Sequence, residues 1–159
     1  MARELITSWG DYQQAIDRLL ATPCRIIRIY DEDLAQLHLE SSSRLPQFKK
    51  LLAAGNTSPC LQIALRNSEP LRNQHPLLMN LLTQYGHRFA AQQTAPQLAN
   101  LRDAMILLDD QHGLIRFDRD QARSKLLIDE PEELRPYRTR FKEIWEEGGE
   151  MVSTTTLGL

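Results

Sequence analysis

Predicted strands and predicted helices alternate along the first 100 residues, and this alternation limits the folds that the chain can form. Short extended segments, most of them rich in β-branched and other apolar residues, are predicted at residues 5–8, 24–30, 61–65 and 87–91. Between them, apolar residues recur with helical spacing at residues 12–20, 45–52 and 77–85. Strands that alternate with helices favour an α/β domain, in which helices cover the faces of a sheet.

The connections between these segments contain typical helix and turn signals. Gly55 and Asn56 are predicted to end the second helix, and Gly86 the third. Two prolines predict a loop over residues 70–76. Residues 92–100 predict a connection without a regular element.

The C-terminal part predicts a meander of hairpins followed by one long helix. Its strands are predicted at residues 104–108, 114–117 and 124–128. Asp129 or Glu130 caps a helix that Pro131 opens and Gly148 ends. Pro136 predicts that the first turn of this helix is separate from the rest.

One domain accommodates all of these elements. The chain has 159 residues, of which 42% are hydrophobic, and a domain of this size buries enough surface to need no metal or disulfide. We expect the domain to span residues 1–148 and residues 149–159, which have no periodicity, to form a flexible tail.

Charge and hydropathy narrow the function classes. The net charge of −2 and the pI near 6.1 provide no overall field that would attract nucleic acid, so nucleic acid is not a predicted partner. No apolar run approaches the length that spans a bilayer, and the N-terminus lacks the apolar region of a secretory signal. We therefore expect a cytoplasmic protein without a membrane partner.

Cysteine and histidine do not form a recognisable site in the sequence. Cys24 and Cys60 are too far apart for a zinc knuckle and are predicted to be buried thiols, with a redox or disulfide role as the less favoured alternative. The four histidines show no ligand spacing, and no glycine-rich phosphate loop is present. The sequence predicts neither a metal nor a cofactor.

Four segments carry a resemblance to a known superfamily. They read Trp-Gly-Asp-Tyr at residues 9–12, Cys-Arg-Ile-Ile-Arg-Ile-Tyr at 24–30, Leu-Arg-Asp-Ala-Met-Ile-Leu-Leu-Asp at 101–109 and Phe-Lys-Glu-Ile-Trp at 141–145. Together they resemble one half-domain of the phospholipase D-like superfamily, and more narrowly a bacterial family of uncharacterised members that lack the catalytic motif. The resemblance implies a mixed β-sheet flanked by helices. It also implies a homodimer, because active relatives build their site from two half-domains.

The same resemblance bears on catalysis. Active members carry His-x-Lys-x-x-x-x-Asp, in which the histidine attacks phosphorus and the lysine, two residues along the strand and on the same face, holds the phosphate. The histidine position is Arg102 here, the lysine position is Ala104, and only Asp109 keeps its residue type. A guanidinium has no free lone pair and a methyl group binds no phosphate, so the resemblance implies that no residue is catalytic by this route.

Arg102, Asp109 and Arg116 are the candidate ligand-binding residues. Arg102 would lie at the mouth of the family's site and could bind an anion through its fork of donors, although an exposed ion pair with Asp103 or Asp109 is the simpler interpretation. Aspartates interleave with the basic residues around Arg116, so the local charges nearly cancel.

Two functional hypotheses follow. The first is a non-catalytic binding or regulatory module that recognises a small anionic ligand or a protein partner through the remnant of the cleft. The second is a phosphodiesterase or nuclease whose catalytic residues have moved, with His87 or His112 as replacements.

Overall fold

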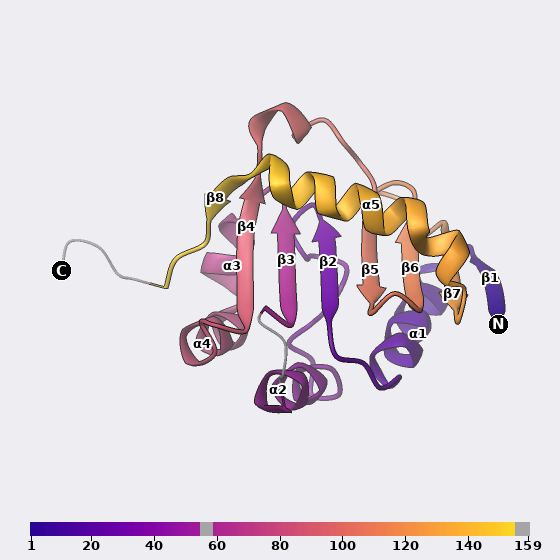
Figure 1. The fold of residues 1–159 in the computed structure, drawn as a ribbon, viewed down its shortest axis with the longest axis horizontal. Helices are drawn as coiled ribbons and strands as arrows, with labels where there is room; N and C mark the ends of the chain where they lie inside the picture. Colours follow the sequence, from indigo (N-terminus) through magenta and orange to yellow (C-terminus); the bar gives the residue numbers. More distant parts are fainter. Residues whose placement is uncertain (55–58, 155–159) are drawn as a thin grey trace.

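The computed structural model describes residues 1–54 and 59–154, and within these residues eight strands form one mixed sheet (Figure 1). In spatial order they are β1 (Ala2–Ile6), β7 (Ser124–Ile128), β6 (His112–Arg116), β5 (Ala104–Leu108), β2 (Ile27–Asp31), β3 (Leu61–Leu65), β4 (Phe89–Thr94) and β8 (Gly149–Met151). Strands β2, β3 and β4 are parallel, and the other neighbouring pairs are antiparallel. The predicted α/β class, a mixed sheet flanked by helices, is confirmed.

Helices cover both faces of the sheet. The helical elements are α1 (Trp9–Leu20), α2 (Leu45–Ala54), α3 (Glu69–Gln74), α4 (Pro76–Gln84), the short 3-10 helix η1 (Pro96–Leu98) and α5 (Pro131–Glu147). Helix α5 crosses one face, and α1 to α4 lie on the other (Figure 1).

Alternation along each strand divides the core between these two faces. In β2, Ile27 and Ile29 belong to the hydrophobic cluster that includes buried residues of α1, α2, α3 and α4. Tyr30, which follows Ile29, belongs to a second cluster with Phe141 and Ile144 of α5. Because side chains of a strand point alternately to opposite faces, the even-numbered residues of β5 and β6 face α1 and the odd-numbered ones face α5.

Several predicted elements are confirmed and others are shifted. The strands at residues 61–65, 104–108 and 124–128 have the predicted bounds, and β6 lies two residues earlier at its start than predicted. Strand β1 lies at Ala2–Ile6 rather than at residues 5–8, because Ser8 caps α1: its Oγ accepts a hydrogen bond from the Asp11 backbone N at 3.1 Å. The predicted end of α2 at Gly55 lies outside the described residues.

The proline-containing segments differ from the prediction. Residues 70–76 do not form a loop, because Pro70 lies in the first turn of α3 and Pro76 in the first turn of α4, where the missing N–H has no helical partner to lose. Helix α5 continues through Pro136, so its first turn is not separate from the rest.

The start of the predicted tail is ordered as a strand. Gly149–Met151 form β8, which pairs with β4, and the backbone N of the buried Val152 donates to the Ala91 carbonyl at 2.8 Å. Consequently β4, predicted as an edge strand at residues 87–91, has β8 beside it and extends to Thr94. Residues 155–159 of the predicted tail lie outside the described residues. Among the described helices, none combines the length and the apolar character needed to cross a bilayer.

Candidate functional site

The candidate site lies where the strand order reverses, at the carboxyl end of β2. Strand β2 has the parallel strand β3 on one side and the antiparallel strand β5 on the other, and ligands of open α/β sheets bind at such a point. Charged residues from four strand ends, from the loops next to them and from α5 meet here. We call them the carboxyl-end cluster: Asp31, Glu32, Arg66, Arg102, Asp103, Arg116, Asp118, Arg119, Asp120 and Arg140.

Arg116 and Asp31 form the buried centre of the cluster. The Nη2 of Arg116 lies 2.7 Å from the Oδ1 of Asp31, and the two side chains are 2% and 1% exposed. The other carboxylate oxygen of Asp31 accepts a hydrogen bond from the Leu34 backbone N at 2.8 Å. The guanidinium carbon of Arg116 lies 5.5 Å and 5.1 Å from the ring centroids of Trp9 and Tyr12. Arg116, predicted as a ligand-binding residue, is almost wholly buried, and its Nε and Nη1 have no hydrogen-bond partner among the described residues.

Ala104, the position that the sequence resemblance assigns to the motif lysine, lies between these two residues. Ala104 is opposite Arg116 in the β5–β6 register, and the register that pairs Met105 with Tyr30 places Ala104 next to Asp31. All three side chains point to the face covered by α1. Ala104 is buried, and its small methyl group allows the Arg116 side chain to reach Asp31 across β5.

Arg102 is engaged by two aspartates that the sequence did not indicate as its partners. Its Nε lies 2.7 Å from Asp118 Oδ2, and its Nη2 lies 2.5 Å from Asp120 Oδ2, while its side chain remains 45% exposed. Hydrogen bonds from Arg102 lower the pKa of Asp118 to about 2. Asp103, considered as a partner of Arg102, instead binds Arg140 through two hydrogen bonds of 2.8 and 3.0 Å.

Glu32 connects two further arginines. Its Oε1 lies 2.8 Å from Arg66 Nε and 3.0 Å from Arg119 Nη1. Burial by itself raises the pKa of Glu32, but the hydrogen bonds from these arginines outweigh burial and hold the pKa below its usual range. Arg66 also donates to the Asp103 carbonyl at 2.8 Å, and its guanidinium carbon lies 4.9 Å from the Tyr30 ring centroid.

Asp109 lies at the opposite end of β5 from Arg102, so the structure does not bring these two candidates together. Its Oδ1 accepts hydrogen bonds of 2.9 Å from the backbone N atoms of Arg25 and Ile26. Its own backbone N donates to the Ile26 carbonyl at 2.9 Å, and its φ of 52° is in the left-handed region that aspartate tolerates. Asp109 thus fixes the chain as it enters β2.

A hollow of about 250 Å³ opens beside the cluster. Its lining includes Arg116 and Arg119 but also Glu32, Asp33 and Asp120. Carboxylates outnumber guanidinium groups in this lining, which opposes the binding of a dianion such as phosphate.

The two histidines considered as replacement catalysts lie away from this cluster. His112 is the first residue of β6, at the far end from Arg116, and its Nδ1 accepts a hydrogen bond from the Asp129 backbone N at 2.9 Å. His87 precedes the amino end of β4. In residues 1–54 and 59–154, no three His, Cys, Asp or Glu side chains are grouped closely enough to hold a metal ion.

The two cysteines are free thiols at the amino ends of neighbouring strands. Cys60 is buried and Cys24 is half-buried. Burial, together with the charge of Asp109, raises the pKa of Cys24 to about 12, and burial raises the pKa of Cys60. Both groups are therefore protonated at neutral pH, which does not favour the redox alternative.

Sequence reasoning did not identify Asp31, Glu32 and Arg66 as members of the cluster. The available signal was the run of three acidic residues at positions 31–33, directly after a buried strand. Nothing local in the sequence marked Arg66, because its partners become neighbours only through the strand order.

Comparison with known proteins places this fold among phospholipase D-like structures. NucT from Helicobacter pylori has a TM-score of 0.60 and 13% identity, over 94% of this chain and 98% of that one. Nuc from Salmonella typhimurium, a phospholipase D family member, has a TM-score of 0.57 and 12% identity, over 96% of this chain and 99% of that one.

A third similar structure is TrmBL2, an archaeal chromatin protein with a novel mode of DNA binding. It has a TM-score of 0.68 and 13% identity, and the match covers 94% of this chain. This chain spans about half of TrmBL2, because the match covers 54% of that protein. No curated protein matches the sequence. A family model described as Domain of unknown function (DUF7931) matches residues 9–157.

Proposed function

The chain belongs to this family of unknown function, and we propose that it is a non-catalytic binding module that keeps the phospholipase D-like fold and pairs with a second copy of itself. The observation that carries the proposal is the row formed by Asp31, Ala104 and Arg116 across β2, β5 and β6. By the sequence resemblance, Ala104 in this row has the position of the lysine that holds phosphate in active members, and the Arg116–Asp31 ion pair supports the proposal by lying on either side of it.

The side chains of Ala104 and Arg102 account for the proposed loss of phosphodiester hydrolysis. The Arg102 guanidinium keeps its proton at neutral pH and is bound by Asp118 and Asp120, so it provides no nucleophile. The methyl group of Ala104 provides no donor for phosphate oxygens. Neither His87 nor His112 lies near the cluster to replace these functions.

The surface of the cluster favours a protein partner over a small anion. Arg102 and Arg119, its exposed arginines, are already paired with carboxylates of the domain, and carboxylates outnumber guanidinium groups around the hollow. Phe117, which follows Arg116, is 43% exposed beside these paired charges. Aromatic and arginine side chains are enriched at protein interfaces.

A second copy of this chain is the partner that fits best. The surface of the cluster presents arginine and aspartate side by side, so a second copy related by a twofold axis meets it without an excess of like charge. Such an interface is self-complementary in charge, with Phe117 as its apolar contact.

Sedimentation velocity over a range of protein concentrations tests the dimer. We expect the wild-type chain to populate a dimer, and Phe117→Glu to shift it to monomer by placing a carboxylate in the interface. Leu77→Glu is the matched control, because Leu77 is 44% exposed but lies on α4, away from the cluster, and should leave the dimer unchanged. A wild-type monomer at every concentration, or a dimer insensitive to Phe117→Glu, would contradict the proposed partner.

A further inference from the structure

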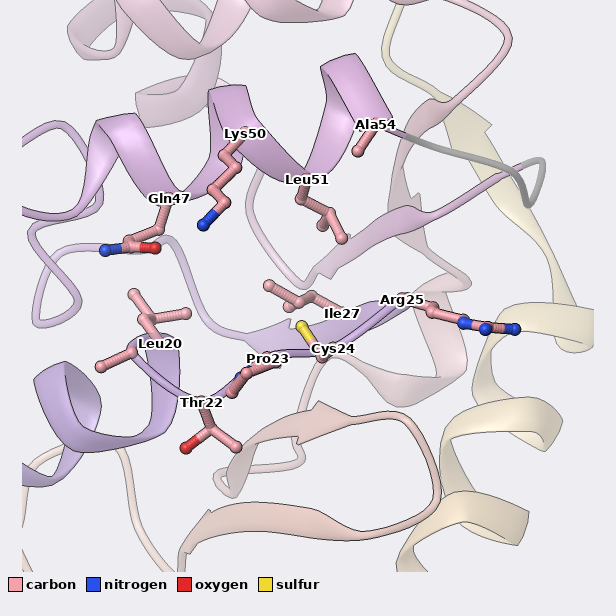
Figure 2. Close-up of a pocket in the computed structure, with 11 residues that line it drawn as sticks. Leu20, Thr22, Pro23, Cys24, Arg25, Ile27, Gln47, Lys50, Leu51 and Ala54 are labelled. Carbon is pink, nitrogen blue, oxygen red and sulfur yellow. The ribbon is translucent and has the colours of Figure 1, made fainter.

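A second hollow lies at the other end of the sheet, and we propose that it binds a small carboxylate with an apolar body, such as a short-chain fatty acid. The hollow has a volume of about 260 Å³ and opens between α2, the segment that follows α1 and the amino end of β2 (Figure 2). It is independent of the proposed dimer, because none of its lining residues belongs to the carboxyl-end cluster.

The inner wall of the hollow is apolar. Leu20, Ile27 and Leu51 line it from α1, β2 and α2, and each of these residues belongs to the buried core. Figure 2 shows the sulfur of Cys24 pointing towards α2 beside Ile27. Because burial holds this thiol in its neutral form, Cys24 adds a weakly polar surface without a charge. This wall suits a hydrocarbon group.

The polar side of the hollow is formed by Lys50, an exposed residue of α2, and by Gln47. In Figure 2 the amino group of Lys50 points from α2 into the space above Cys24, and the amide of Gln47 lies one turn earlier on the same helix. Neither side chain makes a hydrogen bond or ion pair with the described residues that line the hollow, and no Asp or Glu is among those residues. The guanidinium of Arg25 extends away from the space.

These features together define the ligand class. Lys50 and Gln47 supply donors for one carboxylate, and the described lining residues include no Asp or Glu that would compete for the Lys50 charge. The apolar wall requires a hydrocarbon body that an inorganic anion lacks. The hollow beside the carboxyl-end cluster has more acidic than basic lining residues, three carboxylates and two arginines. The hollow beside Lys50 is thus the better anion site of the two.

Titration of the 159-residue chain with hexanoate, followed by amide chemical shifts, tests the assignment. We expect saturable shifts concentrated in residues 20–27 and 47–54. Hexanol, which has the same hydrocarbon body without the charge, and hexylamine, which has the opposite charge, should bind at least about tenfold more weakly, because a charge-assisted hydrogen bond is lost.

Variants of two neighbouring lysines make the test specific. Lys50→Gln should weaken hexanoate binding about tenfold, whereas Lys49→Gln, at an exposed position on the same helix that does not line the hollow, should leave it unchanged. Ala54→Phe places a ring at the rim and should abolish the shifts. Equal effects of the two lysine variants, equal binding of hexanol, or the absence of saturable shifts in residues 20–27 would overturn the proposal.

Discussion

The Arg116 guanidinium and the Asp31 carboxylate form a buried ion pair that joins β6 to β2 across the intervening strand β5, with 2.7 Å between Nη2 and Oδ1. Asp31 accepts two backbone hydrogen bonds, and Arg116 lies over two aromatic rings, while Nε and Nη1 of Arg116 have no hydrogen-bond partner among the described residues. The pair therefore links β6 to β2 at the carboxyl end of β2.

Breaking this ion pair should strongly destabilise the domain. Asp31→Asn leaves the Arg116 charge buried without a counter-ion, and Arg116→Met does the same to Asp31, so each should lower the free energy of unfolding by about 3–5 kcal/mol. The double variant should lose less than the sum of the two, because it removes both charges. Urea unfolding measures all three, and additive losses would show that the two side chains are not coupled.

Introducing a lysine at position 104 should strongly lower the stability of the domain. Ala104→Lys introduces a third charge and a long side chain between Asp31 and Arg116, so we expect a loss of at least about 3 kcal/mol in the free energy of unfolding. Ala104→Ser, which adds one small polar atom, should cost less. A lysine variant as stable as the serine variant in urea unfolding would mean that the position is open.

Two glycines should respond in opposite ways to alanine. A Cβ on Gly113 would lie 2.6 Å from Leu134 Cδ2 and 3.3 Å from the Ile106 carbonyl oxygen, so Gly113→Ala should cost about 1–3 kcal/mol. A Cβ on Gly10, in the first turn of α1, would meet nothing within 4 Å, so Gly10→Ala should stabilise by up to about 1 kcal/mol. Thermal unfolding of both variants checks the signs, and a neutral Gly113→Ala would contradict the close packing of α5 on β6.

The Arg102–Asp118 contact should be visible in the titration of Asp118. Because hydrogen bonds from Arg102 lower the folded-state pKa of Asp118 from 3.8 to about 2, the contact stabilises the fold above pH 4 and is lost as the pH falls from about 4 towards 2. Carboxyl-carbon NMR should give a midpoint near 2 in the wild type, and Arg102→Gln should move it up towards 3.8. An ordinary midpoint in the wild type would mean that Arg102 is free to bind an anion.

The elements of the fold were predictable where the residue pattern that indicates them lies within a few neighbouring positions. The strand at residues 61–65 and the apolar face of α1 are both indicated by the spacing of apolar residues over a few positions. Helix α3 was not predictable from its prolines, because the same residues suit a loop and a first helical turn. Strand β8 has only three residues and is defined by its pairing with β4.

The site was less predictable than the fold. Arg116 and Asp31 are 85 positions apart, and their contact depends on the strand order β6-β5-β2, which no local pattern contains. Arg102 was predicted as a candidate, but its partners Asp118 and Asp120 reach it only through the β5–β6 hairpin. Asp109 has the residue type of the motif, yet it binds the backbone at the start of β2.

The central proposal is that this chain does not hydrolyse phosphodiesters. The most direct test is hydrolysis of bis(4-nitrophenyl) phosphate by the purified chain in the presence of a chelator, since the reaction of active relatives needs a histidine and no metal. We predict a rate equal to that of the buffer alone, unchanged in His87→Gln and His112→Gln. Hydrolysis above the buffer rate that disappears in either histidine variant would contradict the proposal and establish a relocated active site.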